Sequence, residues 1–473
     1  MDKQEKIELT QELQQSLKSE LAWHFRIVPK DKSGDVHHFY LDEEMDEQLV
    51  REELEVILGA RVVLEKKDSL TVRQALGTYY RQADAGHRGT SELKINADTD
   101  FVDRIIMEAD ALGSSDIHIE IYEDRGRVRI RIDGHLIERY SIPLENYPEL
   151  VNKVKIRSNL DISEKRLPQD GRIQYGDFDI RVSILPTLHG EKIVLRILGH
   201  DASSISIDSV GMSEKELKDY QEGIKKPNGI ILISGPTGSG KTTTLYATLK
   251  LLNEEKRNIV TVEDPIEYTL EGINQVQLKE DIGLTFTAAL RSFLRQDPDV
   301  IMLGEIRDSE TAQMAIRAAL TGHLVLSTIH TNSAWGTISR LIDMGVPPFL
   351  LSNTINCSVA QRLVRKLCND CKMLAPVSEA DLPLQYDRSH APEEHFVAVG
   401  CESCHYTGYK GRQAIYEIIP IDNELSNCIK EQNMRVEDLL TTRGIKSIGE
   451  RADSLWKSGV TTLEEVYPFL LNQ

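Results

Sequence analysis

Short apolar runs alternate with amphipathic helical patterns in the second half of the chain. The segments between the runs, such as AALRSFLRQ and TAQMAIRAALTG, repeat apolar residues at helical spacing. The runs are GIILIS at 229–234, NIVTVE at 258–263, DVIMLGE at 299–305 and HLVLST at 323–328. Strands that alternate with helices are typical of a mainly parallel sheet covered on both faces. The pattern predicts an α/β domain over 211–473, with ligands bound beyond the carboxyl ends of its strands.

Residues 101–200 follow a different pattern and predict an α+β domain. An opening helix, FVDRIIMEADALG, is followed by strands in which apolar and charged residues alternate. Asp133-Gly134 is a hairpin signal after the second strand. The expected strands are 117–121, 128–132, 180–186 and 192–198, with a second helix near 149–159. A connection at 199–210 leads to the α/β domain.

The first 82 residues predict a small mixed domain without a catalytic constellation. Its expected elements are a helix at 41–59, a strand at 60–67 and a short helix at 69–82 with Ser69 or Thr71 as its cap. The stretch 83–100 is polar, contains glycines and shows no periodicity. We therefore expect a linker there.

The segment GPTGSGKT follows the first buried strand and leads into a helix, a context that indicates a phosphate-binding loop. Its glycines allow backbone N–H groups to close around phosphate oxygens, and the positive end of the helix adds to the attraction. Lys241 is expected to reach the β and γ phosphates, and the Thr242 hydroxyl to ligate Mg²⁺. The expected nucleotide-binding residues are Gly235, Pro236, Thr237, Gly238, Ser239, Gly240, Lys241, Thr242 and Thr243.

Carboxylates follow the next two apolar runs. Glu263, Asp264 and Glu267 lie close together after NIVTV, where a carboxylate can position or deprotonate the water that attacks the γ phosphate. Glu305 follows DVIML in a Walker B arrangement. Gly304 stands where many nucleotidases have an aspartate, so we expect Glu305 to contact Mg²⁺ through a water.

His323 and His330 flank the last apolar run, HLVLST. A lone histidine is usually a satisfied core or surface residue. Two histidines at one strand of a nucleotide-binding sheet are interpreted as sensors of the γ phosphate.

Four of the six cysteines form two C-x-x-C pairs, Cys368 with Cys371 and Cys401 with Cys404. Each pair places two thiolates on one turn, and two such turns make a closed tetrahedral zinc site. The 29 residues between the pairs must fold back on themselves. A redox dithiol accounts for one pair but not for two. We predict structural zinc in a subdomain at 366–412, and buried small hydrophobes at Cys357 and Cys428.

Composition narrows the class of partner. The formal net charge of −19 disfavours a surface built to grip nucleic acid. No apolar run approaches the length of a membrane span, and the first residues are too polar for a signal peptide. We expect a cytoplasmic protein that touches a membrane only through partners.

The motifs closely resemble those of the secretion-superfamily ATPases, the hexameric motors of type II secretion and type IV pilus assembly. GPTGSGKTTTLYATL, TVEDPIEY, LRQDPDVIMLGEIRDSETA and TGHLVLSTIHTNSA are similar to their Walker A, Asp, Walker B and His boxes. SSDIHIE, LPQDGRI and HGEKIVLRIL resemble their second N-terminal domain. The resemblance implies a RecA-like P-loop core, a preceding PAS-like α+β domain, a small N-terminal partner-binding domain, a Cys₄ zinc subdomain and C-terminal helices.

The resemblance also implies residue roles. Glu267 would be the general base, with Glu263 as the alternative, and Glu305 would organise the waters of the metal. His323 and His330 would couple hydrolysis to movement. Arg172, Arg181 and Arg196 match family arginines that approach the nucleotide from a neighbouring domain, where their charge would stabilise the γ phosphate. Arginines in general are more often solvated than in contact with a ligand, and this alternative stays open for each of the three.

A member of this family would be a Mg²⁺-dependent ATPase and a homohexamer with ATP, Mg²⁺ and Zn²⁺ as its cofactors. Its partners would be the inner-membrane platform and adaptor proteins of a secretion or pilus machine, without direct nucleic-acid binding. Retraction motors of the pilus system typically lack the cysteine module, so its presence points to extrusion of pilin-like subunits. Two alternatives stay open: a DNA-acting hexameric ATPase (a helicase or DNA-uptake motor) and a nucleotide-regulated scaffold without useful turnover.

Overall fold

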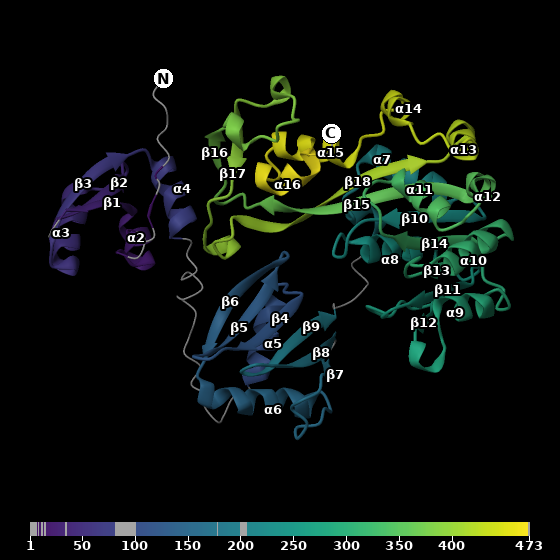
Figure 1. Cartoon of the computed structure of the whole chain (residues 1–473), viewed down its shortest axis with the longest axis horizontal. Coiled ribbons are helices and arrows are strands. Elements are labelled where there is room, and N and C mark those ends of the chain that lie inside the picture. Colours follow the sequence, from purple (N-terminus) through teal and green to yellow (C-terminus); the bar gives the residue numbers. More distant parts are fainter. Residues whose placement is uncertain are drawn as a thin grey trace. The chain divides into compact units, whose positions relative to one another are not determined.

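The computed structural model describes residues 7, 9–10, 13, 16–33, 36–80, 101–176, 178–198 and 206–471 (Figure 1). The predicted linker at 83–100 and most of the predicted connection at 199–210 lie outside these residues. The chain divides into two compact units. The first contains Met1–Leu198 with Leu367–Val377 and Pro392–Gly411, and the second contains Gly199–Lys366, Ser378–Ala391 and Arg412–Gln473.

The N-terminal part of the first unit is a three-stranded sheet with helices. Strand β2 is central, antiparallel to β1 and parallel to β3. The elements are α2 (Ser19–Phe25), β1 (Ile27–Ser33), β2 (Val36–Asp42), α3 (Glu47–Leu58), β3 (Arg61–Lys67) and α4 (Ser69–Tyr79). The predicted strand and both helices are confirmed. The predicted cap of α4 is wrong: Asp68, one residue earlier, accepts from the Thr71 main-chain N–H, as an N-cap carboxylate does.

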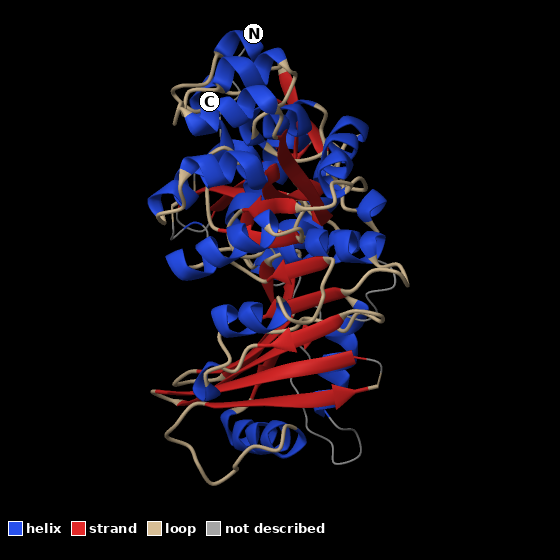
Figure 2. Cartoon of the chain, turned by 90° about the vertical axis from the view of Figure 1, so that its right-hand side faces the viewer, coloured by secondary structure: helices blue, strands red, loops and turns tan. Residues whose placement is uncertain are grey.

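Residues 101–198 form a six-stranded antiparallel sheet in the order β6-β5-β4-β9-β8-β7 (Figure 1). Figure 2 shows the strands of the chain as red arrows and its helices in blue. Alternate strand residues such as Ile117, Ile119 and Val128 pack in one core with residues of both helices. The elements are α5 (Phe101–Ala111), β4 (Asp116–Ile121), β5 (Gly126–Ile132), β6 (His135–Ile142), α6 (Tyr147–Arg157), β7 (Gln169–Tyr175), β8 (Phe178–Thr187) and β9 (Gly190–Leu198). The predicted α+β pattern is confirmed, and β6 and β7 are additional strands.

The second unit is built on a seven-stranded sheet in the order β12-β11-β13-β14-β10-β15-β18 (Figure 1). The neighbours from β12 to β15 pair in parallel. Its strands are β10 (Gly229–Ser234), β11 (Ile259–Glu263), β12 (Asn274–Gln277), β13 (Val300–Leu303), β14 (Leu324–Ile329), β15 (Ile355–Leu367) and β18 (Tyr409–Pro420). The predicted α/β fold with a mainly parallel sheet is confirmed.

Both faces of the sheet at β10 are covered by helices. Ile231 and Ile233 of β10 share a core with residues of α7 and α8. Ile230 and Leu232, which point the other way, are also fully buried, and α10 and α12 contact β10. The helices are α7 (Glu214–Ile224), α8 (Lys241–Leu252), α9 (Phe286–Phe293), α10 (Ser309–Leu320), α11 (Gly336–Asp343) and α12 (Pro348–Thr354).

The chain between β15 and β18 contains all four paired cysteines. Within it, β16 (Met373–Pro376) and β17 (Glu394–Val397) form an antiparallel pair, so the long segment between the cysteine pairs does fold back. The helices after β18 are α13 (Asn423–Lys430), α14 (Glu437–Thr442), α15 (Ile448–Lys457) and α16 (Leu463–Leu470). Arg365 of β15 donates to Glu465 of α16 through Nε at 3.0 Å and Nη2 at 2.6 Å, a contact that anchors the last helix.

Candidate nucleotide site and cysteine cluster

The predicted phosphate-binding loop runs from the end of the buried strand β10 to the first residue of α8. A Cβ atom on Gly235 (φ 152°) would lie 2.5 Å from the Gln361 carbonyl oxygen of β15. One on Gly240 (φ 85°) would lie 2.9 Å from the Gln361 side-chain nitrogen. Gly238 also has a positive φ, of 79°. The loop is therefore pressed against β15 in a conformation that favours glycine.

The N-terminus of α8 has free hydrogen-bonding capacity of the kind that a phosphate uses. Its N-cap, Gly240, supplies no side-chain acceptor, and Thr242 and Thr243 are exposed. The Ser239 hydroxyl is buried without a hydrogen-bond partner. Unsatisfied donors at the positive end of a twelve-residue helix fit an anion. The loop residues therefore fit a nucleotide phosphate.

Lys241 folds back onto its own loop. Its Nζ donates to the carbonyl oxygens of Gly235 at 2.8 Å and Pro236 at 2.9 Å. Burial lowers the pKa of Lys241; the charge of Glu305 opposes that shift and the charge of Arg362 adds to it. A bound phosphate would replace these two carbonyl acceptors with a charged one.

The carboxyl ends of four neighbouring strands bring the predicted motifs to one edge of the sheet. In the pairing of β10 with β14, Ser234 faces Ile329, so Gly235 and His330 follow at the same edge. Leu303 of β13 pairs with Ser327 of β14 and Val262 of β11, which brings Glu305 and Glu263 to that edge as well.

Glu305 lies between Arg307 and His330. Its Oε1 accepts from Arg307, which also lies 3.6 Å from Asp264, and its Oε2 is 3.3 Å from His330 Nε2. Burial opposes ionisation of Glu305, but Arg307 and His330 together outweigh it and lower its pKa. An ionised carboxylate that is 19% exposed can hold a water of the Mg²⁺ shell.

The two Asp-box glutamates have different environments. Glu263 is 3% exposed and accepts from the side chains of Tyr246, Thr261 and Gln275. Glu267 is half-buried, and its main-chain N–H donates to the Tyr246 hydroxyl at 3.4 Å. Glu263 thus accepts from protein donors on both of its carboxylate oxygens.

The structure does not bring His323 to this edge. It precedes β14, and its main-chain oxygen accepts from Gly229 at the amino end of β10. Its Nδ1 lies 2.9 Å from the Ala318 carbonyl oxygen of α10. The expectation that both histidines meet the γ phosphate fails for His323, because a six-residue strand separates them by roughly 20 Å.

Arg362 of β15 is a site residue that the sequence analysis missed. It is 8% exposed and donates to the carbonyl oxygens of Gln361 at 2.9 Å and Asn332 at 2.8 Å. Its Nη1 would lie 3.1 Å from a Cβ on Gly235. Its guanidinium thus ties the loop after His330 to β15, close to Gly235. No local signal in the sequence pointed to it, because Arg362 lies near β10 only through the pairing of that strand with β15, a strand that the apolar pattern did not predict.

The three predicted arginines are cross-strand neighbours in the first unit. Arg181 of β8 pairs in register with Arg172 of β7 and Arg196 of β9. Arg172 is paired with Asp179, and Arg196 Nε donates to Asp116 at 2.9 Å. Arg181 is exposed. The row places three guanidinium groups side by side on that sheet, two of them paired with carboxylates.

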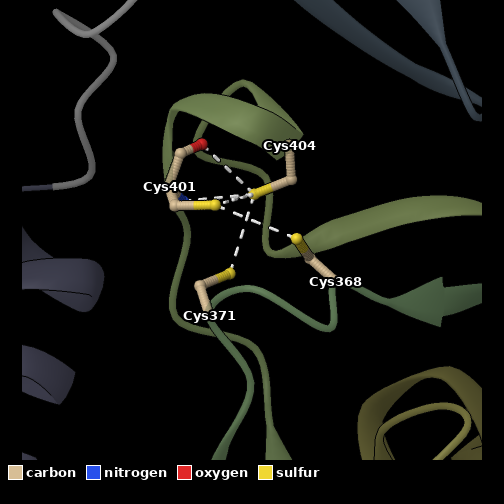
Figure 3. Close-up of side chains that lie close together, drawn as sticks. All are labelled: Cys368, Cys371, Cys401 and Cys404. Carbon is tan, nitrogen blue, oxygen red and sulfur yellow. Dashed lines mark hydrogen bonds between the residues drawn. The ribbon is translucent and has the colours of Figure 1, made fainter.

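The four predicted zinc ligands converge (Figure 3). All four Sγ atoms lie within 4.8 Å of one another, with separations of 3.8 Å for Cys368–Cys401, 3.8 Å for Cys371–Cys404 and 3.7 Å for Cys401–Cys404. Zinc–sulfur bonds of about 2.3 Å in a tetrahedron place the sulfurs about 3.8 Å apart, whereas a disulfide needs about 2.05 Å. The cluster fits zinc. The main-chain N–H groups of Cys401 and Gly408 also donate to Cys404 Sγ, which favours its thiolate.

Cys357 is buried, as predicted, and burial raises the pKa of its thiol. Cys428 is only half-buried. Neither belongs to the cluster.

Fold and site together define the chain as a P-loop nucleoside triphosphatase with a RecA-like core. Residues 94–468 match the family described as "Type II/IV secretion system protein". The chain belongs to this family, and it is an ATPase.

Relatives and a solved structure agree with that placement. The chain is 49% identical to the Type II secretion system protein E of Pseudomonas aeruginosa over 77% of this chain and 74% of the relative. It is 45% identical to the Type IV pilus assembly ATPase PilB of Myxococcus xanthus over 77% of this chain and 66% of the relative. The crystal structure of the pilus retraction motor PilT with bound ADP is similar, with a TM-score of 0.55 and 27% identity, covering 79% of this chain and 97% of that one.

Among the residues that the structure describes, no helix is both long and apolar enough to cross a membrane.

Proposed function

We propose that this chain is a cytoplasmic homohexameric motor that couples ATP hydrolysis to the assembly of pilin-like subunits in a type II secretion or type IV pilus machine. The observation that carries the proposal is the edge of the sheet where the phosphate-binding loop, Glu305, His330 and the Glu267 loop converge. The inner-membrane platform and adaptor proteins of that machine would be its partners. The net charge of −19 supports a protein partner over nucleic acid.

In the proposed site, residues 235–243 hold the phosphates and Thr242 ligates Mg²⁺. The metal would neutralise charge on the β and γ phosphates. Lys241 moves its ammonium from main-chain carbonyls to the phosphates. Glu305 orders waters around the metal, and Glu267 accepts the proton of the attacking water.

His330 is the proposed γ-phosphate sensor. It lies within hydrogen-bonding distance of Glu305, the residue proposed to order the waters of the metal. Arg362 holds the loop that follows His330. His323, at the other end of β14, is proposed to act only through that strand. Arg172, Arg181 and Arg196 are proposed to supply positive charge to a nucleotide in the assembled hexamer.

Zinc is proposed to hold the turn after β15 and the turn before β18 together. Its role would be structural, because four thiolates leave no open coordination position.

The test is a chromosomal Lys241→Ala substitution in the source organism, with secreted proteins and surface pili assayed in the same strain. Loss of secretion with pili intact identifies a secretion motor, and loss of pili with secretion intact identifies a pilus motor. A Lys250→Ala strain is the matched control, because Lys250 is at the far end of α8. The proposal is wrong if neither process changes in the Lys241→Ala strain.

A further inference from the structure

A buried hydrogen-bond network lies between helix α8 and the loop that carries Glu267. Tyr246 of α8 is fully buried, and its hydroxyl donates to Glu263 Oε2. The Tyr246 hydroxyl oxygen in turn accepts from the Glu267 main-chain N–H at 3.4 Å. One hydroxyl therefore joins the helix that starts at Lys241 to both Asp-box glutamates.

The second carboxylate oxygen of Glu263 is also occupied. Its Oε1 accepts from Thr261 Oγ1 at 2.5 Å and from Gln275 Nε2 at 3.0 Å. A buried carboxylate with donors on both oxygens is a structural acceptor, because deprotonating a water would require it to give up one of these bonds.

Gln275 of β12 extends the network along the loop. Its Nε2 also donates to the Tyr268 carbonyl oxygen at 3.2 Å, and its Oε1 accepts from the Leu270 main-chain N–H at 2.7 Å. The Tyr268 ring packs edge-on against the Tyr246 ring, with the centroids 4.8 Å apart. The backbone at Glu267 and just after it is therefore held at Glu267, Tyr268 and Leu270.

We infer that Tyr246, Glu263 and Gln275 are positioning residues that hold the Glu267 carboxylate where it can deprotonate the attacking water. Glu263 then serves as the internal acceptor of this network and not as a second base. The inference rests on the proposed role of Glu267.

The protonation state of the hydroxyl agrees with this arrangement. Burial, followed by the charge of Glu263, raises the pKa of Tyr246 far above physiological pH. The hydroxyl thus remains a donor to Glu263, and its oxygen remains an acceptor for the Glu267 N–H.

The test replaces Tyr246 with Phe in the full-length protein and measures Mg²⁺-ATP hydrolysis. We expect kcat to fall about 10- to 100-fold, because a displaced base loses its alignment, while the KM for ATP changes less than about threefold. Tyr220→Phe is the matched control. Tyr220 is also fully buried, and its hydroxyl bonds to Thr248 of the same helix at 2.8 Å without reaching the loop. It should keep kcat within about twofold of the unaltered protein.

A double-mutant cycle separates positioning from general damage. In a Glu267→Gln background, Tyr246→Phe should change the residual single-turnover rate less than about threefold, because the group that it positions is already gone. An equal loss in both backgrounds would overturn the inference. So would a Tyr246→Phe protein with kcat within about twofold of the unaltered one.

Gln275→Ala decides the matter if Tyr246→Phe does not fold, because Gln275 is only half-buried. It should lower kcat about 10-fold with little change in KM, and an unchanged kcat would contradict the network. These assays do not depend on which machine the motor drives. A failed secretion and pilus test would leave the inference standing, and a failed kinetic test would leave the proposed function standing.

Discussion

Gly235 lies where no other residue fits, directly after β10 and against the backbone of β15. A Cβ there would be 2.5 Å from a main-chain oxygen, which cannot swing away as a flexible side chain can. The same backbone conformation would let the loop N–H groups face a phosphate. The requirement for glycine and the proposed binding of an anion would then have one cause.

Replacing Gly235 with Ala should weaken binding of a fluorescent ADP derivative by about 10-fold or more, because the loop must shift away from Gln361. Gly283→Ala is the control. Gly283 also has a positive φ, of 83°, but nothing lies within 4 Å of a Cβ there. Both variants should have a lower melting temperature than the unaltered protein. Only Gly235→Ala should bind the ADP derivative more weakly. Equal affinities of the two variants would show that the contact with β15 is unimportant.

Site residues could be predicted from the sequence where they directly follow a strand that the sequence itself reveals. The phosphate-binding loop, Glu305 and His330 follow strands whose apolar runs are visible in the sequence. Arg362 was not predictable, because its importance comes from β15 lying beside β10, a tertiary neighbourhood without a local signal. His323 was misplaced for a related reason: flanking the same strand as His330 puts it at the opposite edge of the sheet.

At the scale of elements, β15 and β18 join the nucleotide-binding sheet to the cysteine cluster. They are unusually long, with 13 and 12 residues, and the turns that contain the cysteines lie directly after β15 and directly before β18. A metal held by both turns fixes the ends of these two strands relative to each other. Zinc would thus act on the same strand that supports Gly235.

Purified protein should contain about one zinc per chain, measured by elemental analysis. Cys404→Ser should remove most of the metal and lower the melting temperature, because the remaining thiolates would no longer close a tetrahedron. Cys428→Ser, outside the cluster, should retain both metal and stability. Metal content far below one zinc per chain in the unaltered protein would refute the site.

Element types were predicted better than element boundaries. The buried strands and the helices between them were correct because period and apolar content distinguish them locally. Strands β6, β7, β15 and β18 were not predicted individually, since they mix charged and apolar residues and owe their strand conformation to their neighbours.

At the scale of the whole molecule, the residues predicted to contact the nucleotide are divided between the two units. The ATPase unit contains the phosphate-binding loop, and the row of Arg172, Arg181 and Arg196 belongs to the sheet of the other unit. The sequence predicted which domain contains these arginines. It could not predict a nucleotide partner for them, because any such contact would be decided by assembly and not by the order of residues.

The central claim is that this site hydrolyses ATP with Glu267 as the base, and one measurement tests it directly. Purified full-length protein and its Glu267→Gln variant are compared for Mg²⁺-dependent phosphate release and for binding of a fluorescent ADP derivative. Glu271→Gln serves as the control, because Glu271 is an exposed carboxylate before β12. The account predicts a loss of about 10²- to 10⁴-fold in hydrolysis for Glu267→Gln, with binding retained and with Glu271→Gln unaffected. Hydrolysis by Glu267→Gln at the rate of the unaltered protein would contradict it.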